Sequence, residues 1–208
     1  TSAASIAITN TNNTNAPWYP SLEAFEHYNS GRTHVFPQAT FGGSMSGSNT
    51  VNTLESQTLA YPSGYNMSYL NSNLAYIYGG GYGDVVGSIG AYVAQINPVT
   101  LESVWYNQLI DTANPLSPNY GEWDYPGSLG ILEDGYLYVS YGYRLAKLDP
   151  ATGRVISTLV LPTGEGLPKN TSFNGFNATA DGTIVMKSVY RQAGCTIQGP
   201  DALLDCPD

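Results

Sequence analysis

The segment from Ile131 to Leu161 has the sequence ILEDGYLYVSYGYRLAKLDPATGRVISTLVL and contains three short apolar runs. Tyrosine or serine alternates with aliphatic residues from 136 to 140, which is the period of two typical of half-buried strands. Asp134-Gly135 and the segment 149–153 carry the Asp-Gly and Pro-x-x-Gly patterns of tight turns. The segment therefore predicts a meander of three short antiparallel strands.

The pattern recurs along the chain. YPSGYNMSYLNSNLAYIYGGG from residue 61, DYPGSLGILEDGYLYVSYG from residue 124 and SFNGFNATADGTIVMKSVY from residue 172 align with one another, and Asn97-Pro98 precedes Asp149-Pro150 by 52 residues. Repeats of about 40 to 50 residues made of short strands are typical of β-propellers. We predict an all-β fold, a β-propeller of four-stranded antiparallel blades, with this chain supplying about three to four blades of a larger ring. The alternative is a small irregular sandwich that is complete by itself.

The repeats divide the chain into two parts. Residues 1–32 are a polar lead-in with a short helix expected over 21–28, and residues 33–208 are the propeller segment. The repeats lie near 61–110, 123–161 and 172–208. The last lacks the Leu-Asp-Pro strand, so we expect a second polypeptide, either the rest of a cleaved precursor or a partner subunit, to complete the ring.

These repeats resemble the PQQ-type repeat of the quinoprotein-like propeller superfamily, over roughly residues 60–190. The matching residues are Ala94, Asn97, Thr100 and Trp105 in one blade and Ala146, Asp149, Thr152 and Gly153 in the next. The resemblance implies a propeller fold in which the tryptophan docks between neighbouring blades. Leu101 stands where the family has glycine, and Ser157 stands near the position of the second tryptophan. The adjacent cysteine pair of PQQ alcohol dehydrogenases is absent, so we predict no quinone cofactor.

Composition limits the choice of partners. The net charge is −9 and only 11% of residues are charged. Nucleic acids and anionic membranes are bound by clustered Lys and Arg, so neither is an expected partner. No apolar run approaches the length of about 20 residues that a membrane-spanning helix requires.

The two cysteines, Cys195 and Cys206, lie close together near the end of the sequence. They are either buried free thiols or a local disulfide, and the secreted-type composition favours the disulfide. Four Asn-x-Ser/Thr sequons, which favour a secreted glycoprotein, occur at Asn12, Asn66, Asn170 and Asn177. We predict a secreted, extracellular protein.

Propellers bind ligands where the inner strands converge at the mouth of the channel. We predict that this chain binds a small polar or saccharide ligand there, through aromatic and polar side chains next to the inner strands. The candidate ligand-binding residues are Arg32, Asn66, Trp123, Tyr125 and Asn174. Asn and Asp oxygens from successive blades make Ca²⁺ a candidate ligand of the same site.

Two further hypotheses stay open. The first is a hydrolase or lyase in which His34, Asp124 and Glu122 perform acid–base chemistry, because paired carboxylates beside a histidine suit proton transfer. The second is a structural extracellular protein that presents a flat propeller face to a partner. The sequence does not decide between binding, catalysis and a structural role.

Overall fold

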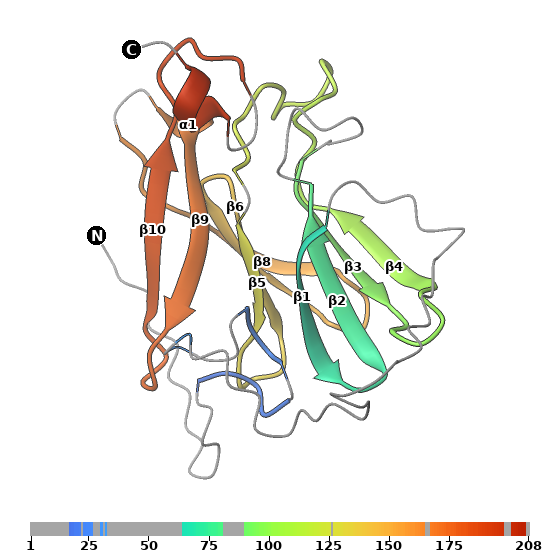
Figure 1. The fold of residues 1–208 in the computed structure, drawn as a ribbon. Helices are drawn as coiled ribbons and strands as arrows, with labels where there is room; N and C mark the ends of the chain where they lie inside the picture. Colours follow the sequence, from blue (N-terminus) through green and yellow to red (C-terminus); the bar gives the residue numbers. More distant parts are fainter. Residues whose placement is uncertain are drawn as a thin grey trace, which may run out of the picture.

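The computed structural model describes most of the chain from residue 64 onward and a few segments before it. The described residues are 17–21, 23–26, 30, 32, 64–80, 90–125, 127–164, 167–197 and 201–206. The prediction for His34 and that for the sequon at Asn12 lie outside these residues. The structure is nearly all β, with three antiparallel sheets of four, four and two strands (Figure 1).

The first blade is a four-stranded meander in the order β1-β2-β3-β4. Its strands are β1 (Gly64–Asn71), β2 (Leu74–Gly79), β3 (Tyr92–Ile96) and β4 (Ser103–Gln108). The tight β1–β2 turn forms because Asn71 accepts a bond from the Asn73 amide, an Asx turn that reverses the chain in two residues.

The second blade repeats this order as β5-β6-β7-β8. Its strands are β5 (Ser128–Ile131), β6 (Leu137–Tyr141), β7 (Arg144–Leu148) and β8 (Val155–Val160). The Asp-Gly turn forms as predicted: Gly135 has φ 78°, and Asp134 accepts a bond from the Tyr136 amide. The prediction of an all-β fold of four-stranded antiparallel sheets is confirmed.

A two-stranded sheet follows, made of β9 (Thr171–Ala178) and β10 (Ile184–Tyr190). A 3-10 turn, η1 (Pro168–Asn170), precedes it, and the four-residue helix α1 (Ala202–Asp205) follows. No helix in the described part of the chain is both long and apolar enough to cross a membrane.

The first strand of each sheet lies beside the first strand of the next. Asn66 on β1 donates to the carbonyl of Leu129 on β5 at 3.1 Å, and the Phe176 amide on β9 donates to Ser128 on β5 at 3.3 Å. Figure 1 shows the three sheets fanning outward from these strands. This arrangement, in which each sheet packs on its neighbour through its first strand, is that of propeller blades.

The N-terminal segment packs on the core. A helix is predicted over 21–28, but the residues described within that range, 21 and 23–26, are not helical. Phe25 instead makes an isolated antiparallel bridge with Gly130, and Trp18 makes one with Leu132. Both aromatic side chains are fully buried, and their rings stack 4.1 Å apart. Burial of two aromatic rings outweighs the weak local helix propensity of a single turn.

The 52-residue repeat extends to individual hydrogen bonds. Asn97 and Asp149 hold equivalent turns, since each amide donates to the carbonyl five residues later, and each carbonyl accepts from the amide four residues later. Trp105 on β4 donates through Nε1 to the carbonyl of Pro150 at 3.1 Å. The tryptophan therefore docks between the blades, as the resemblance implied.

One position departs from the repeat at a cost. Gly153 has φ 70°, and its equivalent Leu101 has φ 60°. Residues with a Cβ rarely adopt this left-handed backbone conformation. We expect the free energy of unfolding of Leu101→Gly to be about 1 kcal/mol higher than that of Leu101→Ala. Both variants lose the leucine side chain beyond Cβ, but only glycine removes the strain of a positive φ. Urea denaturation of the two variants measures this difference.

Gly153→Ala is the matched control. A Cβ at Gly153 would lie 2.4 Å from Cε3 of Trp105, so this variant should be strongly destabilised. Equal stability of Leu101→Gly and Leu101→Ala would show that the left-handed backbone at residue 101 carries no strain.

Candidate functional site

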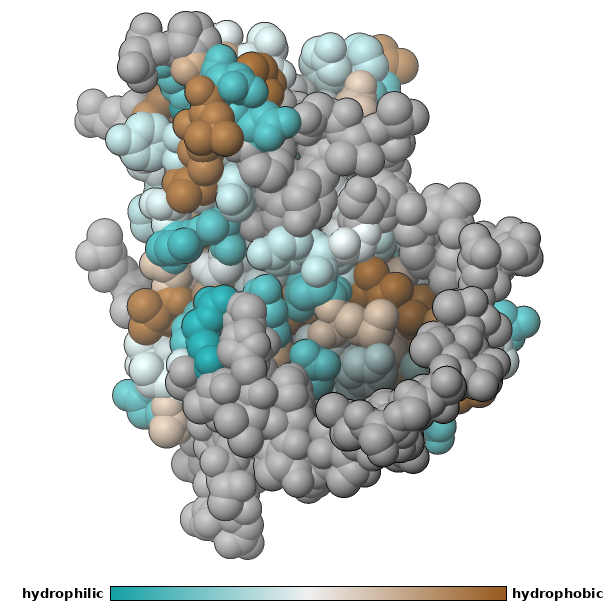
Figure 2. Space-filling view, in the orientation of Figure 1, coloured by the Kyte–Doolittle hydropathy of each residue, from teal (hydrophilic) through white to brown (hydrophobic). Residues whose placement is uncertain are grey.

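A cavity of about 330 Å³ opens among β1, β5, β9, β10 and the N-terminal segment. This volume lies at the lower end of the range for small-molecule sites. Its walls are mixed in character: three aromatic, three uncharged polar, three charged and three small or aliphatic residues. In that order they are Phe25, Tyr65 and Phe176; Ser128, Asn174 and Asn177; Glu26, Arg32 and Lys187; and Gly175, Val185 and Met186. On the face drawn in Figure 2, hydrophilic and hydrophobic side chains likewise lie close together across the middle of the molecule.

Two asparagine side chains near the inner strands have an unpaired amide oxygen. The Oδ1 atoms of Asn174, which lines the cavity, and of Asn66 on β1 are buried and accept no hydrogen bond among the described residues. An unsatisfied buried acceptor costs roughly 1–3 kcal/mol. Asn174 lines the cavity, so a ligand hydroxyl that reached this oxygen, with a small rotation of the side chain, would remove that cost.

The predicted carboxylates lie elsewhere, at the junction of the first two blades. Glu122 is 4% exposed and forms a two-pronged salt bridge with Arg144, at 2.8 and 3.2 Å. The guanidinium also lies 4.1 Å above the centre of the Tyr143 ring. Burial lowers the pKa of Arg144, but the hydrogen bond and charge of Glu122 outweigh this and raise it above the usual value. Glu122 is a paired structural carboxylate.

Asp124 is enclosed in the same junction and is 3% exposed. Its Oδ1 accepts the Gly142 amide at 3.0 Å, and its Oδ2 has no partner in the described part of the chain. Burial raises the pKa of Asp124 to about 7, against the opposing effects of the Gly142 and Ala91 amides and the charge of Arg144. The carboxyl therefore changes its protonation state near pH 7, and it does so in the blade junction, where it does not line the cavity.

The structure separates the predicted site residues into two groups. Arg32 and Asn174 line the cavity, whereas Glu122, Trp123, Asp124 and Tyr125 do not. Trp123 is 1% exposed and meets Tyr125 edge-on at 5.6 Å, so its ring packs inside the blade junction. No catalytic pair drawn from Asp124 and Glu122 faces the cavity in the described residues.

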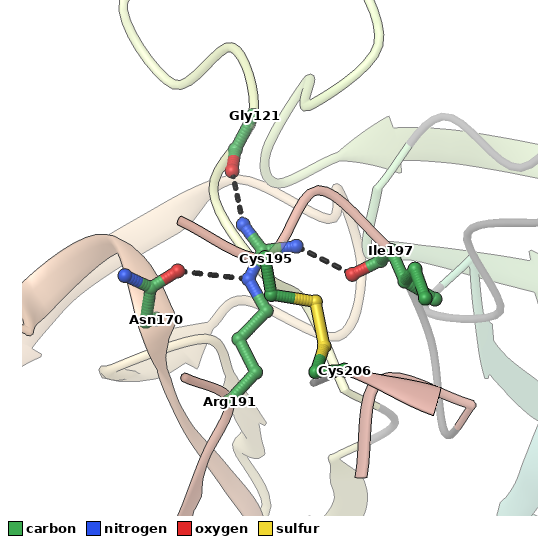
Figure 3. The surroundings of a disulfide bond; sticks show 6 residues. All are labelled: Gly121, Asn170, Arg191, Cys195, Ile197 and Cys206. Carbon is green, nitrogen blue, oxygen red and sulfur yellow. Dashed lines mark hydrogen bonds between the residues drawn. A yellow bond between two sulfur atoms is a disulfide. The ribbon is translucent and has the colours of Figure 1, made fainter. Parts of the chain in front are cut away.

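The disulfide predicted between Cys195 and Cys206 is present. Beside it, Arg191 on the strand-to-loop junction is 4% exposed and donates to three neutral oxygens: Asn170 Oδ1, the Gly121 carbonyl and the Ile197 carbonyl (Figure 3). Burial lowers the pKa of Arg191. This guanidinium connects the disulfide loop to the end of η1 and to the segment before β5. The contacts around the disulfide therefore hold these segments together.

The sequons have different surroundings. Asn66 and Asn177 each donate a side-chain amide N–H to a carbonyl, of Leu129 and Ser30, at 3.1 and 2.9 Å, so a glycan on either nitrogen would have to fit beside that bond. The side-chain oxygen of Asn170 accepts a hydrogen bond from Arg191, and its side-chain nitrogen takes no part in that bond. Glycosylation stays a prediction, and Asn170 is the described sequon that best accommodates it.

Calcium fits the cavity less well than a polar organic ligand. Ca²⁺ is bound by several oxygen ligands that include carboxylates. The described cavity wall has one carboxylate, Glu26, and two cations, Arg32 and Lys187. No group of three or more His, Cys, Asp or Glu side chains in the described segments is placed to hold a metal ion.

Sequence reasoning missed several cavity residues, namely Glu26, Tyr65, Ser128 and Lys187. Tyr65 and Ser128 stand at the beginnings of inner strands, so a ranking of every residue at those positions would have found them. Lys187 lies in the middle of β10, and no local pattern distinguishes it from an ordinary exposed lysine.

We expect Asp124→Asn to stabilise the protein increasingly as pH rises. The folded-state pKa of about 7 lies above the ordinary value of 3.8. The stability that Asp124 contributes is therefore fully present below about pH 4 and is lost as pH rises through about 7. Each unit of pKa difference corresponds to about 1.4 kcal/mol of stability. The melting temperature of Asp124→Asn should therefore rise above that of the unmodified protein by several degrees as the buffer is changed from acidic to alkaline.

Asp205→Asn, at an exposed position in α1, is the matched control and should track the unmodified protein throughout. A constant difference between Asp124→Asn and the unmodified protein across this pH range would contradict the assignment of an uncompensated buried carboxyl.

Comparison with known proteins gives limited information. No protein-family model matches the chain, and no curated protein matches it. Among solved structures the chain is similar to quinohemoprotein alcohol dehydrogenase from Comamonas testosteroni, with a TM-score of 0.40 and 16% sequence identity. The match covers 57% of this chain and 16% of that chain. A similarity this coarse carries no argument about activity.

Proposed function

We propose that this chain is a propeller segment that binds a small polar or saccharide ligand in the cavity between its inner strands. The observation that carries the proposal is that Asn174, whose buried Oδ1 has no hydrogen-bond partner among the described residues, lines a cavity of about 330 Å³. Sugars present hydroxyl donors that satisfy such acceptors, and their ring faces stack on aromatic side chains. Tyr65 lines the same cavity and is 41% exposed, and in this proposal its ring stacks on the sugar.

Binding without chemistry accounts for the site better than hydrolysis or elimination does. An acid–base mechanism requires a proton-transferring group within hydrogen-bond reach of the ligand. Of the predicted catalytic carboxyls, Asp124 has a pKa of about 7 but lies in the closed blade junction and does not line the cavity. Glu26 is the one carboxylate among the described residues of the wall, and His34 lies outside the described residues. The disulfide supports a location outside the reducing cytosol, as expected for a secreted protein.

We expect ligand-observed NMR screening of mono- and oligosaccharides against the chain to identify binders that Asn174→Ala weakens by about tenfold. This factor corresponds to about 1.4 kcal/mol, which is the scale of one hydrogen bond to a buried acceptor. Isothermal titration calorimetry of each binder gives the dissociation constants.

Asn73→Ala is the matched control. Asn73 is exposed in the β1–β2 turn, at the opposite end of β1 from Tyr65, so its removal should leave affinity unchanged. Circular dichroism establishes that both variants are folded. An absence of any sugar binder, or equal affinity of Asn174→Ala and the unmodified chain, would overturn the proposal.

We also propose that polypeptide outside this sequence completes the ring. In the first two blades the second strand pairs on both sides: β2 with β1 and β3, and β6 with β5 and β7. In the third sheet β10 pairs with β9 alone among the described strands, and it exposes Val185 and Tyr190. An open strand edge favours pairing with another strand.

Native mass spectrometry of the protein from its natural source tests this second proposal. We expect a species well above 22.2 kDa that contains further polypeptide, either linked to this sequence or released from it on denaturation. A folded, monodisperse monomer of 22.2 kDa would contradict ring completion and favour a small closed sandwich.

A further inference from the structure

The cavity concentrates positive charge in an acidic protein. The chain has a net charge of −9 and only seven Lys and Arg residues. Two of these seven, Arg32 and Lys187, line the one cavity described above, although they are 155 positions apart in the sequence. Glu26 is the only acidic residue among the described residues of the wall, so the cations outnumber the carboxylates.

Neither cation has a partner within the described structure. The same is true of the exposed Arg154 and Lys169, but of these four only Arg32 and Lys187 line the cavity. Arg144 and Lys147 each form a salt bridge of 2.8 Å, with Glu122 and Asp134 respectively. The side chains of Arg32 and Lys187 form no salt bridge or hydrogen bond in the described structure. Their charges are available to a ligand.

The backbone at Arg32 adds a second, independent observation. Arg32 has φ 50°, and only one other non-glycine residue in the described segments, Leu101, has a positive φ. Such backbone is unfavourable for a residue with a Cβ and often accompanies functional positions, where the surrounding structure holds it. The unfavourable backbone lies at a residue that lines the cavity.

We propose, as an extension of the proposed function, that the cavity binds a saccharide bearing an oxyanion, a carboxylate or a sulfate. The planar guanidinium of Arg32 suits two-pronged binding of an oxyanion, and the ammonium of Lys187 supplies a second charge to the same group. In this proposal Asn174 accepts a hydrogen bond from a ring hydroxyl, and Tyr65 covers a face of the sugar ring. The ligand is thus distinguished from neutral sugars by charge and from inorganic anions by its ring and hydroxyls.

The test compares pairs of sugars that are matched except at the charged group. Calorimetric titrations use oligogalacturonate, its fully methyl-esterified form, and a sulfated galactose oligosaccharide with its unsulfated parent. We expect the charged member of at least one pair to bind about tenfold more tightly than its neutral counterpart at low salt. The preference should shrink as sodium chloride rises to about 0.5 M, because the screening length then falls below about 5 Å. The two pairs distinguish a carboxylate from a sulfate as the recognised group.

Variants assign the preference to the two cations. Arg32→Gln and Lys187→Gln should each reduce the preference for the charged sugar several-fold while leaving affinity for the neutral sugar unchanged. Arg154→Gln and Lys169→Gln remove the same charges from exposed positions that do not line the cavity, and they should have no effect. These controls separate a local contact from a change in the net charge of the protein.

Each outcome bears on a different claim. Equal binding of charged and neutral sugars that still depends on Asn174 would overturn the oxyanion inference and leave saccharide binding supported. A charge preference that survives both Arg32→Gln and Lys187→Gln would also overturn it. Failure of all four sugars and of inorganic sulfate to bind would overturn the oxyanion inference together with the proposed function.

Discussion

The close approach of three aromatic rings to Gly130 is the contact on which the assembly of the described structure depends. Trp18, Phe25 and Phe176 form one cluster, with ring centres 4.1 to 5.9 Å apart. A Cβ at Gly130 would lie 2.8 Å from the Trp18 ring and 2.9 Å from the Phe25 ring. Glycine therefore lets the N-terminal segment and β9 meet on β5. This packing also sets the cavity, because Phe25 and Phe176 form part of its wall.

Local sequence patterns predicted the strands and turns that depend on contacts between residues close together in the sequence. Alternation and turn residues located the strands from residue 128 to 160, because each hairpin turn is formed by its own residues: the Asp134 and Asp149 side chains accept amides of their turns, and Gly142 adopts a positive φ. The helix over 21–28 was wrong because Phe25 is controlled by a partner more than 100 residues away, Gly130. Contacts of that range leave no periodic trace in the sequence.

The candidate site was predicted only in part, for the same physical reason. Arg32 and Asn174 were selected from the sequence and do line the cavity, whereas the acidic and aromatic run at 122–125 does not. In the sequence, Glu122 and Asp124 look like available carboxylates beside an aromatic platform. In the fold, Arg144 pairs with Glu122 across 22 residues, and Asp124 is enclosed by the Gly142 turn. Whether a charged group is free depends on its distant neighbours, which one sequence does not reveal.

Some arginine and lysine side chains are paired within the fold, and two are left unpaired at the cavity. At the blade junction Glu122 neutralises Arg144, and beside the disulfide three oxygens surround Arg191. Arg191 is buried and the Arg144 side chain is only 15% exposed, so an unpaired charge at either position would be costly, and both have partners within the fold. Arg32 and Lys187 have none in the described structure, yet they share one concave wall with an unpaired amide oxygen. Arg32 and Lys187 are exposed at the cavity, and the oxyanion that we propose as part of the ligand would supply the negative charge that they lack within the described structure.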